Sequence, residues 1–249
     1  MKNSILKIDN ISKTYYTLEK EIKAVDNFSL NLQEGEFVAL VGPSGCGKST
    51  ILSILSGLEK LDTGTIKTDK SIGYMLQTDA LFEWLNILDN CLIGLKIKKE
   101  LTNENKEYVI SLLEKYGLKD FIYSYPSNLS GGMRQRVALI RTLATKPDIL
   151  LMDEPFSALD YQSRLSISDD VYKIIKEEGK SIIMVTHDIA EAISMCDKVV
   201  ILSKRPCNVK KIIDITYDKK SIPSNNRKEN KFSSYYDEIW REIDYEQGI

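Results

Sequence analysis

Long apolar runs are absent from this sequence of 249 residues. No window reaches 18 apolar residues, and the opening Met1-Lys-Asn-Ser-Ile5 lacks the apolar stretch of a secretion signal. We therefore expect neither a membrane-spanning helix nor a leader peptide. Any role at a membrane would have to come through a partner.

Cysteine, histidine and net charge are scarce as well. The four cysteines, at positions 46, 91, 196 and 207, have no metal-ligand spacing and are typical of reduced cytosolic thiols. The 34 basic and 36 acidic residues leave a formal net charge of −2, which argues against a nucleic-acid partner, although a local basic patch stays possible. What is present, 43% hydrophobic and 28% charged residues, is typical of a globular chain.

A glycine-rich loop, the phosphate loop (residues 42–50), carries the strongest chemical signal. It reads Gly42-Pro-Ser-Gly-Cys-Gly-Lys-Ser-Thr50 and follows the apolar run Phe37 to Val41, which predicts a buried strand. Its glycines allow backbone N–H groups to turn toward phosphate oxygens, while Lys48 adds a positive charge and the Ser49 hydroxyl is a ligand for Mg²⁺. The expected nucleotide-binding residues here are Gly42, Pro43, Ser44, Gly45, Cys46, Gly47, Lys48, Ser49 and Thr50.

Two adjacent carboxylates follow another buried run, Ile149 to Met152. Side chains alternate along an extended chain, so Asp153 is predicted to hold the hydration shell of Mg²⁺ and Glu154 to act as general base toward water. His187, the only histidine, follows the run Ser181 to Val185 and is expected at the same sheet edge. In isolation, a solvated acidic pair and a structural histidine would be the simpler interpretations.

A second turn of phosphate-binding type precedes a helix. This signature turn (residues 129–133) reads Leu129-Ser-Gly-Gly-Met133, and Ser130, Gly131 and Gly132 offer a hydroxyl and open backbone N–H groups to an anion. An ordinary helix cap is the alternative. Two phosphate-binding helix starts beside one carboxylate pair need an explanation.

The order of patterns predicts an α/β fold. Alternating residues at 4–12 and 28–33 indicate antiparallel strands, continuous apolar runs at 149–152 and 181–185 indicate strands covered on both faces, and segments 87–98 and 102–116 are helical. The last segment places an apolar stripe on one helical face, formed by Phe232, Tyr236, Ile239, Trp240 and Ile243. We expect it to pack on the core, with a regulatory contact as the alternative.

From about residue 4 to 215 the chain resembles the ATP-binding cassette of ABC transporters. The matching motifs are the phosphate loop as Walker A, Gln77 as the Q-loop glutamine, the signature turn as the ABC signature, Ile149 to Glu154 as Walker B, Ser157 to Asp160 as the D-loop, and His187 as the switch histidine. The resemblance adds Gln77 as a catalytic residue and Mg²⁺ ligand, Asp160 as a nucleotide-site residue, and Tyr15 as the aromatic that stacks on adenine, with Tyr16 as its rival.

The resemblance implies a single cassette domain over 1–249. Residues 4–86 and 149–215 would form a RecA-like core sheet with an N-terminal antiparallel β-subdomain, residues 87–148 a helical subdomain, and residues 216–249 a C-terminal extension with an amphipathic helix. It also implies that two cassettes pair head to tail, so that each ATP lies between one chain's phosphate loop and the other's signature turn.

The subfamily resemblance is to cassettes that serve nitrate, sulfonate and taurine import. It predicts an ATPase at the cytoplasmic face of the cell membrane, held there by permease subunits and linked through them to an extracytoplasmic solute-binding protein. Leu81, Phe82 and Trp84 are candidates for the permease groove or for ordinary subdomain packing. The alternatives are a soluble cassette ATPase of DNA repair or translation, although such chains usually carry coiled-coil insertions, zinc cysteines or tandem cassettes, and an export cassette.

Overall fold

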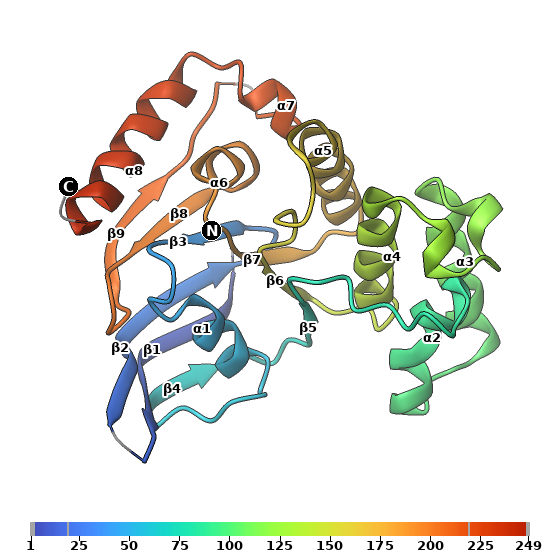
Figure 1. The fold of residues 1–249 in the computed structure, drawn as a ribbon, viewed down its shortest axis with the longest axis horizontal. Helices are drawn as coiled ribbons and strands as arrows, with labels where there is room; N and C mark the ends of the chain where they lie inside the picture. The colour runs from blue at the N-terminus through green and yellow to red at the C-terminus, as the bar shows by residue number, and fades with distance from the viewer. Residues whose placement is uncertain (1–2, 19, 219, 248–249) are drawn as a thin grey trace.

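Two sheets organise the computed structural model, which describes residues 3–18, 20–218 and 220–247 (Figure 1). The smaller is antiparallel, with strands in the order β2 (Glu21–Gln33), β1 (Ser4–Tyr16) and β4 (Thr63–Lys67). β1 and β2 are longer than their alternating segments predicted, because their pairing continues through register shifts toward Tyr16 and Glu21. The predicted antiparallel β-subdomain is therefore present.

The larger sheet places the chemistry-bearing residues at one edge. Its order is β5 (Ile72–Met75), β6 (Ile149–Asp153), β7 (Ser181–Val185), β3 (Phe37–Val41), β8 (Lys198–Leu202) and β9 (Val209–Asp214). The first five strands are parallel, and β9 runs antiparallel to β8. The carboxyl ends of β3, β6 and β7 thus lie together, which is where open α/β sheets bind their ligands.

Continuous apolar runs became β3, β6 and β7 because both faces of this sheet are covered. Phe37, Ala39 and Val41 of β3 belong to one apolar cluster, whereas Val38 and Leu40 belong to the other. The second cluster also contains residues of the small sheet and of α1 (Lys48–Leu55), so these elements cover one face. The first includes residues of α5 (Tyr161–Glu177) and α6 (Ile189–Met195), which cover the opposite face.

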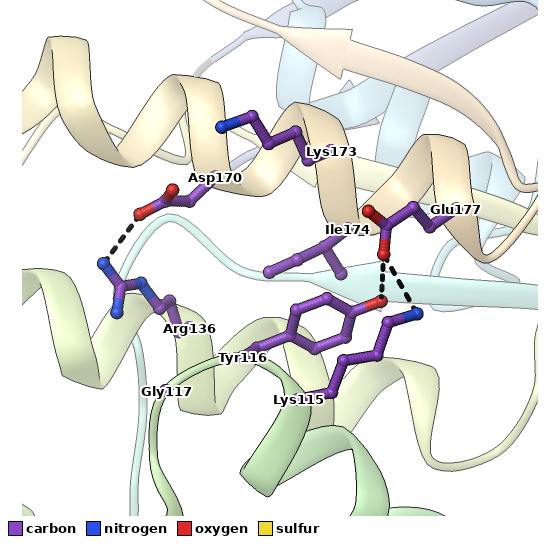
Figure 2. Close-up of a pocket in the computed structure, with 8 residues that line it drawn as sticks. All are labelled: Lys115, Tyr116, Gly117, Arg136, Asp170, Lys173, Ile174 and Glu177. Atoms are coloured by element: carbon purple, nitrogen blue, oxygen red, sulfur yellow. Dashed lines mark hydrogen bonds and ion pairs between the residues drawn. The ribbon is translucent and has the colours of Figure 1, made fainter.

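A group of helices extends to one side of the sheets in Figure 1. It comprises α2 (Ile87–Lys98), α3 (Asn103–Lys115), the 3₁₀ turns Lys119–Phe121 and Pro126–Asn128, and α4 (Gly131–Leu143). Figure 2 shows the pocket between this group and α5, bridged by Arg136 to Asp170 (Nη2 to Oδ2, 2.7 Å) and by Lys115 to Glu177 (Nζ to Oε2, 2.9 Å). These ion pairs join the helical group to the core. The proposed division of the chain at 87 and 149 remains a prediction.

The C-terminal helix α8 (Lys231–Gln247) follows the short helix α7 (Pro223–Asn226) and packs near α6 and β8. Ile239 is fully buried, and Phe232, Tyr236 and Ile243 pack partly against the core. Trp240 differs from the prediction: it is 49% exposed and stacks on Tyr236, with ring centroids 6.2 Å apart. The predicted apolar face of this helix is therefore wider than the part of the helix surface that the core covers.

Among the described helices, none combines the length and the apolar character that crossing a bilayer requires.

Candidate nucleotide site

The phosphate loop connects β3 to α1, and its backbone requires glycine at Gly47. That residue has φ +132°, and a Cβ atom there would lie 2.6 Å from the Ala24 carbonyl oxygen. Gly47 is also the N-cap of α1, immediately before its first residue, so the free N–H groups of the first helical turn face the loop. The local sequence thus builds an anion cradle from backbone alone.

Lys48 lies at the base of this cradle. Its side chain is buried, and Nζ donates hydrogen bonds to the carbonyl oxygens of Gly42 (2.7 Å) and Pro43 (2.9 Å). These bonds hold the ammonium group within the loop. The pocket that opens beside it is lined by Ser44, Gly45, Gly47, Lys48, Ser49, Thr50, Glu154 and Arg205. The loop and the proposed general base therefore share one cavity.

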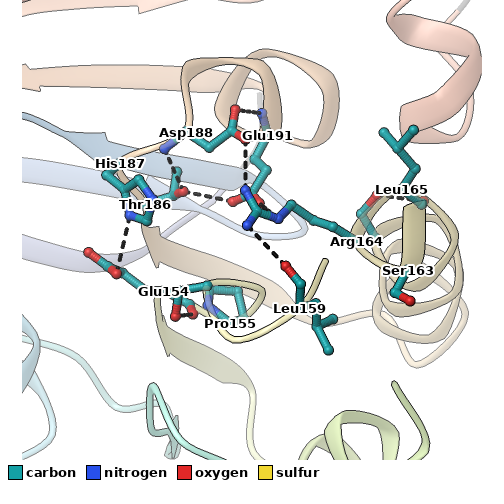
Figure 3. Close-up of polar contacts among 12 residues, drawn as sticks. Glu154, Pro155, Leu159, Ser163, Arg164, Leu165, Thr186, His187, Asp188 and Glu191 are labelled. Carbon is teal, nitrogen blue, oxygen red and sulfur yellow. Dashed lines mark hydrogen bonds and ion pairs between the residues drawn. The ribbon is translucent and has the colours of Figure 1, made fainter. Parts of the chain in front are cut away.

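The two carboxylates at the end of β6 have different neighbours. Asp153 is buried, and burial raises its pKa while hydrogen bonds from Ser49 and from Tyr74 (Oη to Oδ2, 3.3 Å) oppose that rise. Glu154 lies instead beside Gln77, whose Nε2 donates to Oε2 (3.1 Å), and beside His187, whose Nδ1 is 3.2 Å from the same oxygen (Figure 3).

The backbone of Glu154 is in the left-handed region, with φ +43°. A non-glycine residue there costs of order 1–3 kcal/mol, and such strain is found at sites whose surroundings hold it in place. The Glu154 N–H donates to the Val185 carbonyl at 2.9 Å, which fixes the turn against β7. The strained backbone thus lowers stability but places this carboxylate beside Gln77 and His187.

The residues predicted to bind Mg²⁺ are suited to it in part. The Ser49 hydroxyl and the Asp153 carboxylate are hard oxygen donors in contact with each other, and Gln77 lies on the Glu154 side of the pair. Among the described residues there is no group of three or more His, Cys, Asp or Glu side chains arranged for a metal ion. Such a sparse set suits Mg²⁺, which keeps several waters and binds mainly to substrate phosphates.

The signature turn forms a different pocket on the same chain. Ser130 caps α4 by accepting a hydrogen bond from the Met133 N–H (3.4 Å), and Asp160 caps α5 by accepting from Gln162 and Ser163 (3.1 Å each). The lining comprises Ser130, Gly131, Gly132, Met133, Arg136, Ala158, Leu159, Asp160, Ser163, Ser166 and Ile167. No residue is shared with the phosphate-loop pocket. Within one chain, the phosphate loop and the signature turn therefore line separate pockets.

The structure leaves the adenine contact open. Tyr15 packs partly against the second apolar cluster, with Lys13 Nζ 5.4 Å from its ring centroid, and Tyr16 is 77% exposed. Neither lines the phosphate-loop pocket. Both remain predictions.

Sequence reasoning missed two neighbours of the phosphate loop from the β8–β9 connection. The Arg205 guanidinium donates to the Gly45 carbonyl through Nε (3.1 Å) and Nη2 (2.5 Å), and the thiol of buried Cys207 lies beside Cys46. A hydrogen bond from Cys207, together with Lys48, lowers the pKa of the Cys46 thiol below its usual value. No local pattern announces these contacts, since Arg205 is 160 residues from Gly45.

The comparison with known families settles what this site belongs to. The family model described as ABC transporter matches residues 25–157, which include the phosphate loop, the signature turn and the acidic pair. The chain is a member of the ABC transporter ATP-binding family. The cassette accordingly binds and hydrolyses ATP.

Individual relatives agree with this assignment. The cassette is 42% identical to the uncharacterized ABC transporter ATP-binding protein YtlC of Bacillus subtilis (strain 168), over 96% of each chain. It is 37% identical to the taurine import ATP-binding protein TauB of Ruegeria pomeroyi, over 92% of this chain and 89% of the relative. A dimeric post-hydrolysis structure of the ATP-binding cassette MJ0796 with ADP and Pi matches at TM-score 0.73 and 33% identity, covering 86% of this chain and all of that one.

Proposed function

We propose that this cassette is the ATP-hydrolysing subunit of an importer that carries a small solute through a separate membrane permease. The solute class we favour is the one served by taurine, sulfonate and nitrate importers, or a related organic nutrient. The taurine-import relative supports this choice, because its similarity extends over nine tenths of the chain. The cassette would work at the cytoplasmic face of the membrane, held there by the permease and reached by solute from an extracytoplasmic binding protein.

One observation carries the proposal: the phosphate-loop pocket and the signature-turn pocket are separate on one chain. Each has only half of what a nucleotide site needs, namely a cradle with a carboxylate pair or a helix N-terminus with a hydroxyl. A head-to-tail pair of cassettes would complete two equivalent sites. ATP would then join the two chains, and hydrolysis would release them, which is a motion that a permease can use.

Each side chain at the completed site has a role that its position supports. Lys48 and the loop N–H groups would hold the β- and γ-phosphates, and Glu154 would accept a proton from the attacking water. His187 would orient Glu154 and the water, since its ring lies within 3.2 Å of the carboxylate. Mg²⁺, held by Ser49, Asp153 and Gln77, would neutralise charge on the phosphate oxygens.

The segment 77–86 offers the permease contact. Arg134 of α4 pairs with Asp79 (Nε to Oδ2, 2.8 Å), and Arg141 donates to the backbone carbonyls of Asp79 (2.6 Å) and Ala80 (2.7 Å). Trp84, from the same segment, is 73% exposed and lies against Phe82, with ring centroids 5.1 Å apart. A movement of α4, the helix that follows the signature turn, would therefore also move the exposed Trp84, which a membrane subunit can bind.

Glu154→Gln tests the hydrolytic part. The amide keeps the size of the side chain but is a poor proton acceptor, so ATP binding should persist, turnover should fall at least about 100-fold, and ATP should trap a dimer. Steady-state hydrolysis and size-exclusion chromatography with MgATP measure both effects. Turnover near that of the wild type would remove Glu154 as the general base.

Uptake by the source cells tests the transport part. Deletion of the cassette should abolish ATP-dependent uptake of one labelled solute among taurine, an alkanesulfonate and nitrate, and the wild-type chain, but not Glu154→Gln, should restore it. Unchanged uptake of all three would contradict the proposed solute class. Altered efflux in its place would identify an exporter.

A further inference from the structure

We propose that Arg164 is a positioning residue for ATP hydrolysis. It holds two segments together: the turn that contains His187, and the loop that runs from Glu154 toward the proposed dimer interface. This loop, the 154–160 loop, starts at the proposed base and ends at Asp160, on the side of the signature turn. The inference rests on the proposed roles of Glu154 and His187. It adds a residue, from the first turn of α5, that touches neither pocket.

The guanidinium of Arg164 contacts both segments (Figure 3). Its Nη2 donates to the Leu159 carbonyl at 3.2 Å, which holds the 154–160 loop one residue before Asp160. Its Nη1 lies 3.3 Å from Asp188 Oδ2, directly after His187 in the chain. One planar, permanently charged group therefore joins the 154–160 loop to Asp188, which lies 24 residues beyond Arg164 in the sequence.

Glu191 strengthens the link from inside the protein. It is 3% exposed, its Oε1 is 3.6 Å from Arg164 Nε, and its Oε2 accepts a 2.7 Å hydrogen bond from Thr186 Oγ1. Thr186 Oγ1 in turn accepts from the Asp188 N–H at 3.0 Å. Both residues that flank His187 are thus held by the same buried network.

His187 needs such support because its own packing does little to place it. Its side chain is 53% exposed, while the Glu154 carboxylate with which it pairs is on a strained backbone. An error of about 1 Å in a catalytic group can lower a rate by about 100-fold. A partner cassette that presses on the 154–160 loop would shift Leu159, and Arg164 would pass that shift to the His187 turn.

The experiment compares Arg164→Met, Arg164→Lys and Glu191→Gln with variants of a matched ion pair. Lys198 and Glu36 form an ion pair of similar burial, with Nζ and Oε1 2.7 Å apart and side-chain exposures of 19% and 10%. Lys198 is the first residue of β8 and Glu36 directly precedes β3, and neither residue lines either pocket. Lys198→Met and Glu36→Gln are therefore the controls. Steady-state ATP hydrolysis gives kcat and KM, and binding of a fluorescent ATP analogue in a Glu154→Gln background gives affinity without turnover.

We expect Arg164→Met to lower kcat between about 10- and 100-fold while the affinity changes less than about twofold. Arg164→Lys should recover part of kcat, because one ammonium keeps the charge but cannot span both segments. Glu191→Gln should have an intermediate effect. The controls should keep the wild-type kcat even where their thermal midpoints fall.

Two results would overturn the inference: equal kcat values for Arg164→Met and Lys198→Met, or a parallel loss of kcat and affinity in Arg164→Lys. Where Arg164→Met does not fold, Arg164→Lys and Glu191→Gln decide the question, since the first keeps the positive charge and the second keeps the side-chain size. A Glu154→Gln chain that still hydrolyses ATP would instead defeat the proposed function, whatever the Arg164 variants do.

Discussion

At the scale of single residues, burial raises the pKa of two carboxyl groups in and near the site, Asp153 and Glu191. Glu191 is the clearest case, because its pKa is raised from 4.5 to about 7. Burial is the main cause and Asp188 adds to it, while Thr186, Arg164 and His187 act in the opposite direction. The carboxylate is retained within a network that ionised Arg164 completes. A buried carboxylate in such a position costs stability when it ionises.

The pH dependence of folding should report this cost. The unfolded chain releases the Glu191 proton near pH 4.5 and the folded chain near pH 7, so this group makes stability fall as pH rises through that window. Between about pH 5 and pH 7.5, the wild type should lose on the order of 2 kcal/mol more unfolding free energy than Glu191→Gln. Urea unfolding at both pH values measures the difference. Parallel curves would show that Glu191 ionises normally.

Local patterns predicted residues whose chemistry is local and missed those whose role depends on distant neighbours. Gly47, Lys48 and Ser49 are consecutive, so their spacing announces a phosphate cradle. Arg164 and Arg205 act through carbonyl oxygens of Leu159 and Gly45, and an arginine near an acidic segment is too common to indicate such a bond. Only the fold shows which carbonyls they reach.

At the scale of elements, the buried strands were predictable from the sequence. How much of the C-terminal helix α8 the core buries was less predictable. The apolar runs that became β3, β6 and β7 are buried along their whole length, so hydrophobicity alone identified them. In α8, helical periodicity placed Trp240 beside Ile239, but the core covers Ile239 and leaves Trp240 half exposed. Periodicity gives the direction of an apolar face and not the width that the neighbours cover.

Substitutions in α8 separate its packing role from a regulatory one. Ile239→Ala removes a fully buried side chain and should lower the unfolding free energy by about 2–4 kcal/mol, whereas Trp240→Ala should cost less than about 1 kcal/mol. Both should hydrolyse ATP at the wild-type rate at a temperature where they are folded. Urea unfolding and steady-state turnover measure the two properties. A changed turnover in Trp240→Ala would favour the regulatory alternative.

At the scale of the whole molecule, the question is how two separate pockets make one enzyme. The phosphate loop at β3 and the signature turn at α4 face different cavities, and Asp160 belongs with the signature turn. The motifs predicted both turns, but only the family resemblance implied that they serve different ATP molecules, because distances between elements depend on tertiary packing. The proposed site between two chains would account for a chain that carries both halves and completes neither.

Mixing two inactive variants tests this arrangement directly. Ser130→Arg fills the signature-turn pocket with a long cation, and Lys48→Ala removes the charge of the phosphate loop, so each variant alone should be inactive. In a mixed dimer, the intact phosphate loop of the first variant meets the intact signature turn of the second, and the opposite site holds both defects. When the two variants are mixed in equal amounts, random pairing makes half of the dimers mixed, and each mixed dimer has one working site of two. Turnover should then recover to about a quarter of the wild-type value if that site works independently. Steady-state hydrolysis over a range of mixing ratios, with circular dichroism to confirm that both variants fold, makes the measurement. Inactivity at every ratio, with mixed dimers shown to form, would contradict shared sites and place the whole reaction within one chain.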